Sequence, residues 1–214
     1  MRLTKYIKEH KEIYLFIFYF LFIVLFGLIQ KYYNPVSSHL VTWPIDYYMP
    51  YNQYFMIAYA IWWPFVPAAF IFFYFRDIPS FKSLCFQVLI VCYLTLIIYI
   101  IYPSYLDLRQ PIYETDVCSK AVLWLRSIDP PRNVFPSLHV SETVSICFVV
   151  YKSRDLLLNR YVKGIIYLIG ILIIVSTIYI DQHSIADILF AIILSVIFYI
   201  ICPNFEKEQK AGVA

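Results

Sequence analysis

The chain consists mainly of long apolar runs that alternate with short polar segments. A transmembrane helix needs about 20 mostly apolar residues in succession, and six runs match or approach that length. They fall at about Ile13–Gln30, Tyr54–Phe75, Ser83–Tyr102, Leu138–Tyr151, Tyr161–Ile180 and Ser184–Ile201. The fourth run is short, so its helix is expected to start by Ser137 or to tilt. The pattern predicts an all-α, polytopic membrane protein, a six-transmembrane-helix bundle that forms a single domain over residues 1–214.

Composition excludes a water-soluble fold and several kinds of site. Of the 214 residues, 62% are hydrophobic and only 14% are charged, whereas a soluble domain needs about a quarter of its residues charged. The net charge of +3 is explained by membrane topology, and no nucleic-acid partner is expected. The five cysteines show no paired spacing, which predicts neither a disulfide framework nor a zinc site. No cofactor and no metal ion are expected.

The basic residues predict the orientation, because lysine and arginine favour the cytoplasmic side of a membrane. Twelve of the seventeen lie on the side of the N-terminus: Arg2, Lys5, Lys8, Lys11, Arg76, Lys82, Lys152, Arg154, Arg160, Lys163, Lys207 and Lys210. The other five lie on the opposite side: Lys31, Arg109, Lys120, Arg126 and Arg132. We therefore expect a multi-pass protein of the plasma membrane with both termini in the cytoplasm. The segment between the third and fourth runs is then extracytoplasmic.

That outer segment, residues 103–136, is long for a loop without its own role. Its part Thr115–Ser127 has apolar residues at helical spacing and predicts an extracytoplasmic loop helix, which Thr115 or Asp116 can cap. The helix lies in the headgroup layer or packs on the outer rim of the bundle. Either arrangement places Lys120, Arg126 and Arg132 near lipid phosphates.

Two histidines stand at the start of apolar runs on the outer face. His139 begins the fourth run, His183 precedes the sixth, and Arg109 lies in the outer loop. Asp187 follows His183 by four residues, so both side chains share one helix face. A carboxylate bonded to one ring nitrogen fixes the tautomer and leaves the other nitrogen basic. The two rings are expected to face each other across a phosphate-sized gap.

Each of these residues also has a simpler explanation. Asp187 can be an ordinary acidic residue at a helix N-terminus, although an aspartate within a span is costly without a partner. His139 can be an interfacial anchor. Ser137 can cap the helix or donate to an anion at its free amides.

The segment Phe135-Pro-Ser-Leu-His139, followed by Ser176-Thr177-x5-His183-x3-Asp187, resembles the type 2 phosphatidic acid phosphatase superfamily, most closely its branch near inositol phosphorylceramide synthases. The resemblance places the core of the domain at about residues 54–202 and implies six spans with an outward-facing site. It implies that His183 is the nucleophile that forms a phosphohistidine and that Asp187 orients it. It also implies that His139 protonates the leaving alkoxide and that Ser137 binds phosphate.

The chain departs from the superfamily's signatures at several cations. Arg109 is followed by Gln110 before Pro111, Tyr102 stands where a lysine is expected, and Thr177 stands where an arginine is expected. Leu138 also replaces a glycine. Phosphoryl transfer depends strongly on cations that hold the transferred oxygens. Besides Arg109, the candidates to replace the missing cations are Arg132 first, then Lys120 and Arg126.

Three further residues are candidates for supporting roles: Glu142, Ser176 and Thr177. Glu142 lies three residues after His139, within the fourth run. It can bond His139 and help it act as an acid, bind a polyol headgroup, or reach the membrane surface.

These residues predict an integral membrane phosphatase that acts on a lipid phosphate at the extracytoplasmic face, with membrane lipids as its surroundings. If a lipid or polyol hydroxyl replaces water as the acceptor, the enzyme is a phosphotransferase of the inositol phosphorylceramide synthase kind. A non-catalytic membrane protein that retains the fold is the third hypothesis. The sequence does not identify the lipid or the acceptor.

Overall fold

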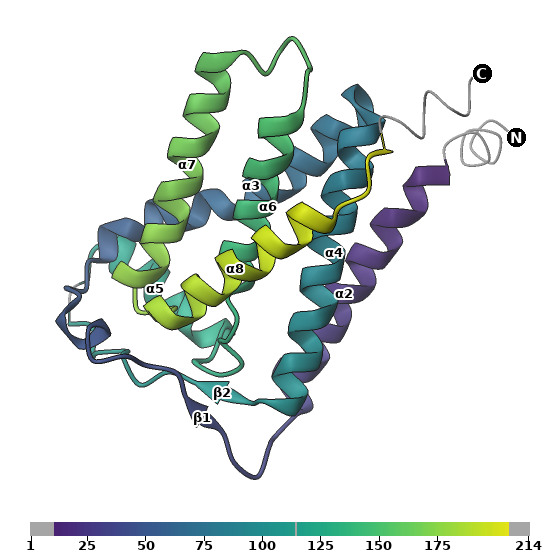
Figure 1. The fold of residues 1–214 in the computed structure, drawn as a ribbon. Coiled ribbons are helices and arrows are strands. Elements are labelled where there is room, and N and C mark those ends of the chain that lie inside the picture. The colour runs from purple at the N-terminus through teal and green to yellow at the C-terminus, as the bar shows by residue number, and fades with distance from the viewer. Residues whose placement is uncertain (1–10, 114, 206–214) are drawn as a thin grey trace, which may run out of the picture.

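The computed structural model describes residues 11–113 and 115–205, and Figure 1 shows that they are almost entirely helical. The α-helices of this part are α2 (Tyr14–Tyr32), α3 (Met56–Arg76), α4 (Ile78–Ile101), α5 (Val117–Ile128), α6 (Leu138–Lys152), α7 (Arg160–Tyr179) and α8 (Ile185–Ile201). Short 3-10 helices cover Lys11–Ile13, Asp46–Tyr48 and Gln53–Phe55. The strands β1 (His39–Leu40) and β2 (Ser104–Tyr105) pair in parallel. The predicted all-α class is confirmed.

The bundle is organised around α6, which packs against α3, α4, α7 and α8. On one side, α2 runs along α4 (Figure 1), and aromatic rings fill the space between α2, α3 and α4. Phe22, Phe70, Phe81 and Tyr99 are among the buried members of this core. The opposite side of α2 exposes large apolar side chains such as Phe18 and Phe20, as expected for a helix whose solvent is lipid.

Four helical segments are long and apolar enough to cross a membrane: Tyr14–Tyr32, Gln53–Arg76, Ile78–Ile101 and Arg160–Tyr179. These segments support a membrane protein. The helices α6 and α8 have 15 and 17 residues, fewer than the roughly 20 of a typical span. The described residues therefore give four clear spans, and the expected count of six depends on two shorter helices.

Polar residues set the helix ends, which is why hydropathy alone misplaces some of them. Helix α4 begins at Ile78, five residues before the predicted Ser83, because Asp77 caps it and accepts the Ser80 backbone N–H at 3.1 Å. Ser184 caps α8, and its partner in a reciprocal capping box is Asp187. Of the basic residues used for the orientation, Arg2, Lys5, Lys8, Lys207 and Lys210 lie outside the described residues.

The predicted loop helix is α5, and it packs on the rim of the bundle. Asp116 caps it, accepting the backbone N–H groups of Cys118 and Ser119. Its residues Val122 and Leu125 are buried in a cluster with Met56, Tyr59 and Ile180. The packing on the rim, one of the two arrangements expected from the sequence, is present, and the depth of the helix relative to the lipid headgroups stays a prediction.

Candidate functional site

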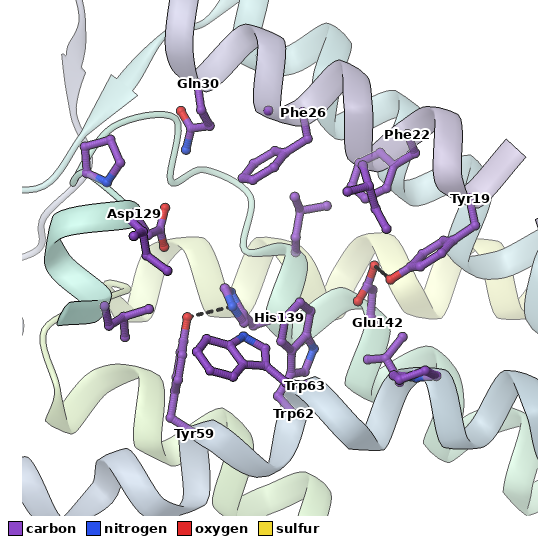
Figure 2. A pocket seen from close by; sticks show the side chains of 18 of the residues that line it. Tyr19, Phe22, Phe26, Gln30, Tyr59, Trp62, Trp63, Asp129, His139 and Glu142 are labelled. Carbon is purple, nitrogen blue, oxygen red and sulfur yellow. Dashed lines mark hydrogen bonds between the residues drawn. The ribbon is translucent and has the colours of Figure 1, made fainter. Parts of the chain in front are cut away.

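His183, His139 and Asp187 meet in one chain of hydrogen bonds. His183 Nδ1 lies 2.8 Å from Asp187 Oδ2, and His183 Nε2 lies 3.3 Å from His139 Nδ1. His139 Nε2 lies 2.7 Å from the hydroxyl of Tyr59, as Figure 2 shows for that pair. Helices α3, α6 and α8 thus each contribute a side chain, and the loop before α8 contributes His183.

The partners in this chain assign the proton positions. Asp187 accepts, so His183 carries its proton on Nδ1 and its Nε2 is a free base. His139 then donates from Nδ1 to His183, which leaves His139 Nε2 to accept the Tyr59 hydroxyl. This assignment satisfies the four side chains of the hydrogen-bonded chain, Asp187, His183, His139 and Tyr59, without two donors facing each other.

Asp187 also bonds the start of its own helix, so it acts both as an acidic residue at a helix N-terminus and as the partner of His183. Its Oδ1 accepts the Ser184 backbone N–H at 3.0 Å and also bonds the Ser184 hydroxyl. Its Oδ2 remains for His183. The start of α8 is fixed in turn by Asp46, whose Oδ1 accepts the Ile185 N–H at 2.9 Å. The orientation of the His183 ring is therefore built into the helix start.

The prediction of a phosphate-sized gap between the two imidazoles is wrong, because His183 Nε2 and His139 Nδ1 are within hydrogen-bonding distance at 3.3 Å. The space lies beside the rings instead. A small cavity of about 30 Å³ borders both histidines, and that volume holds about two or three water-sized groups. Its other polar lining residues are Gln30, Arg109, Asp129, Arg132, Asn133 and Gln182.

Three residues that line this small cavity have buried N–H groups without a hydrogen-bond partner in the described part of the chain. They are Nε of Arg109, Nε of Arg132 and Nε2 of Gln182. Unpaired buried donors are rare and costly in folded proteins. Three residues with such donors, two of them arginines, therefore line this one small cavity.

Arg109 is fixed in this site as a cation. Its Nη2 donates to the Asp129 carbonyl at 2.7 Å and to Gln182 Oε1 at 2.8 Å. Burial lowers the pKa of Arg109 to about 10, so it stays protonated at neutral pH. Burial also raises the pKa of the Asp129 carboxyl, although His183 and Arg109 oppose that effect.

Of the other predicted cations, Arg132 is the one that lines the small cavity and a larger one beside it, among the described residues. Its Nη1 donates to Asn34 Oδ1 at 3.2 Å. Arg126 instead pairs with Asp181 at 3.1 Å, and burial raises the pKa of that carboxyl to about 6 although Arg126 opposes it. Lys120 is exposed on α5. Neither Arg126 nor Lys120 borders the large or the small cavity.

The predicted hydroxyl residues bond to the backbone of their own helices. Ser137 is the N-cap of α6 and accepts the Val140 N–H at 3.4 Å. Ser176 and Thr177 donate to carbonyls three residues earlier, those of Ile173 and Ile174. The Thr177 carbonyl accepts the N–H of His183 at 3.1 Å, so Thr177 supports the loop that carries His183 through its backbone.

Glu142 does not bond His139, in contrast to one of the expectations from the sequence. Its Oε1 accepts the Tyr19 hydroxyl at 3.1 Å and lies 3.3 Å from the Cys92 thiol. Glu142 is 2% exposed, so it does not reach the surface either.

A large, mostly apolar cavity of about 790 Å³ opens next to the small one. Figure 2 shows its walls, with Phe22 and Phe26 from α2 facing Trp62 and Trp63 from α3. The two cavities share the lining residues Phe26, Gln30, Asp129, Pro130, Arg132, Leu138 and His139. A ligand with an anionic head and an apolar body fits such a pair.

Sequence reasoning missed three residues of the site. Tyr59 lies inside an apolar run and carries no motif. Asp129 and Gln182 could have been suspected from their positions, because Gln182 directly precedes His183 and Asp129 follows the last residue of the loop helix. None of the three has a spacing that points to its partner.

The comparisons with known proteins agree with this geometry. A model of the PAP2 superfamily matches residues 78–211, a segment that includes Arg109, His139, His183 and Asp187. The family resemblance drawn from the sequence is confirmed. No curated protein and no solved structure matches the chain. The matched segment leaves out α2 and α3, which form much of the large cavity.

Proposed function

Because this chain belongs to the PAP2 superfamily, we propose that it is an integral membrane phosphatase for lipid phosphates with a phosphohistidine intermediate on His183. Membership supports phosphatase or phosphotransferase activity in general. The lipid substrate, the intermediate and the extracytoplasmic position of the site are parts of the proposal.

One observation carries it. Arg109, Arg132 and Gln182 line the same small cavity as the two histidines, and each has a buried N–H group without a partner among the described residues. They supply donors for the oxygens of a phosphoryl group beside a basic imidazole nitrogen. The adjoining apolar cavity then takes the hydrocarbon of the substrate.

The first step is attack of His183 Nε2 on phosphorus, which forms an N–P bond and breaks the P–O bond to the lipid. His139 holds a proton on each ring nitrogen once the phosphate anion is bound, with the Tyr59 hydroxyl as the acceptor of its Nε2–H. It turns its Nδ1–H from His183 to the leaving oxygen and gives it that proton, so its own ring becomes neutral, while Asp187 stabilises the positive charge that develops on His183. In the second step, water attacks the phosphorus, the N–P bond breaks, and His139 takes the proton of the water. Inorganic phosphate and the original protonation states result.

The substrate reaches the site from the bilayer in this account. Helices α2 and α3 both pack on α4, and the large cavity lies between them. We place the short helices α6 and α8 across the membrane as the fifth and sixth spans, held inside the bundle by α4 and α7. The termini are then cytoplasmic, and the site faces the outside of the plasma membrane.

The direct test is phosphate release from short-chain phosphatidate by protein purified in detergent. Release that depends on both His139 and His183 is the expected result. New phospholipid formed when inositol or ceramide is added identifies a phosphotransferase instead. Folded protein that releases no phosphate and transfers none contradicts the proposal and favours a non-catalytic protein.

The apolar cavity gives a prediction about chain length. Gly27 lines this cavity, and a Cβ added there meets nothing within 4 Å, so Gly27→Phe adds a ring to the cavity wall from a position with room for its Cβ. We expect the variant to lower kcat/KM for a sixteen-carbon lipid phosphate by at least about tenfold and to affect a four-carbon one much less.

The matched control is Gly164→Phe on α7, because Gly164 also has open space around it and lies outside the cavity. Equal effects of Gly27→Phe on both chain lengths, or equal effects of the two variants, would show that the hydrocarbon does not occupy this cavity.

A further inference from the structure

Two acidic residues line the large cavity. Asp129 also borders the small cavity, whereas Glu142 does not and has no role in the reaction described above. Glu142 lies on α6 and lines the cavity, as does Tyr19 of α2, which reaches its carboxylate (Figure 2). Burying a carboxylate in such surroundings is costly unless its oxygens are bonded. Its presence therefore calls for an explanation.

Half of that explanation is structural. Glu142 Oε1 accepts the Tyr19 hydroxyl and lies beside the Cys92 thiol, so it ties α2 and α4 to α6. The other oxygen, Oε2, is buried and has no hydrogen-bond partner among the described residues. A purely structural link needs only one oxygen. The second one is available to a ligand.

The position of Glu142 relates that ligand to the phosphoryl group. Glu142 follows His139 by three residues on the same helix, and such residues have Cβ atoms about 5–6 Å apart. Both side chains line the large cavity. A group that bonds Glu142 Oε2 therefore lies only a few bonds from the phosphate that His139 serves.

We propose that Glu142 selects lipid phosphates that carry a hydrogen-bond donor, a hydroxyl or an amide N–H, close to the phosphate. This inference rests on the proposed function and narrows its substrate class. A carboxylate oxygen accepts only, so ester-linked chains and simple hydrocarbon chains have nothing to offer it. Trp62 also lines this cavity and packs on the His139 ring with centroids 4.2 Å apart. Its buried indole N–H has no partner within residues 11–113 and 115–205. A hydroxyl or an amide can satisfy either group, since each donates and accepts.

The test compares three single-chain lipid phosphates of equal chain length with detergent-purified protein. Hexadecyl phosphate has no donor, 1-palmitoyl-glycerol 3-phosphate has a hydroxyl, and the phosphate ester of N-palmitoylethanolamine has an amide N–H. We expect kcat/KM to be about 10–100-fold higher for at least one of the two donor-bearing lipids, as for a hydrogen bond to a charged group. The hydroxyl and amide arms show which donor the site takes.

Variants assign the preference to Glu142. Glu142→Leu removes the acceptor and is expected to bring the ratio of kcat/KM close to one. Glu142→Gln keeps a neutral acceptor of the same shape and is expected to reduce the ratio of kcat/KM between donor-bearing and donor-free lipids in part. If Glu142→Leu does not fold, the result for Glu142→Gln alone tests the role of Glu142. The control Tyr19→Phe removes the partner of Oε1, leaves Oε2 in place, and is expected to retain the preference.

The outcomes separate this inference from the proposed function. Equal kcat/KM for all three lipids, or an unchanged preference in both Glu142 variants, overturns the role of Glu142 and leaves the phosphatase intact. No turnover of any lipid phosphate by folded wild-type protein overturns the proposed function itself, and the inference with it.

Discussion

Replacing His183 by alanine is expected to lower phosphate release from a lipid phosphate by at least about 10³-fold, since loss of a covalent nucleophile removes the main route of reaction. His183 is 6% exposed and bonded to Asp187 and His139, so no neighbouring group can take its place without moving. Steady-state release of inorganic phosphate from short-chain phosphatidate measures the effect.

His39→Ala is the matched control. His39 stacks on Tyr102 with ring centroids 4.2 Å apart and lines neither of the two cavities. Activity close to wild type in this variant, with activity lost in His183→Ala, is the expected pair of results. Comparable activity in the two variants would exclude His183 as the nucleophile.

Replacing Arg109 by glutamine is expected to reduce kcat/KM by about 10³-fold, the lower end of what one arginine contributes to phosphoryl transfer. The guanidinium stays charged at neutral pH and is aligned by the Asp129 carbonyl and Gln182. Arg109→Lys retains the charge but loses the planar fork, so we expect an intermediate loss.

The control for Arg109 is Arg154→Gln, which removes a cation from the exposed loop between α6 and α7. It is expected to leave kcat/KM near the wild-type value. Equal kcat/KM in Arg109→Gln and the wild type would mean that the small cavity does not hold the phosphoryl group.

The sequence predicted the parts of the site that depend on local spacing. His183 and Asp187 lie four apart at a helix start, and a helix brings such residues together whatever surrounds them. The two explanations considered for Asp187, helix charge and histidine partner, are both present, since its two oxygens serve Ser184 and His183 separately.

Contacts between distant segments were less accessible. The approach of Arg109 to Gln182, across 73 positions of the chain, requires the loop after β2 to fold back onto the loop before α8. Tyr59 reaches His139 only because α3 packs on α6. Hydropathy identifies α3 as a span but cannot tell which face it turns toward the histidine.

Which cations approach the histidines also depends on contacts between distant segments. The sequence ranks Arg132 before Lys120 and Arg126 as a phosphate ligand, but all three occur in or after the loop helix and no spacing shows which of them reach the histidines. In three dimensions, Arg126 is paired with Asp181, Lys120 is exposed, and Arg132 borders the small cavity. The rim packing of α5 through Val122 and Leu125 produces this division.

The central claim is that the phosphoryl group passes through His183. Brief incubation with a lipid phosphate labelled on phosphorus, followed by alkaline quenching and peptide mapping, tests it most directly. The account predicts an acid-labile, base-stable label on the peptide that contains His183, and no such label in His183→Ala. An active protein with no labelled histidine, or the same label in His183→Ala, would contradict it.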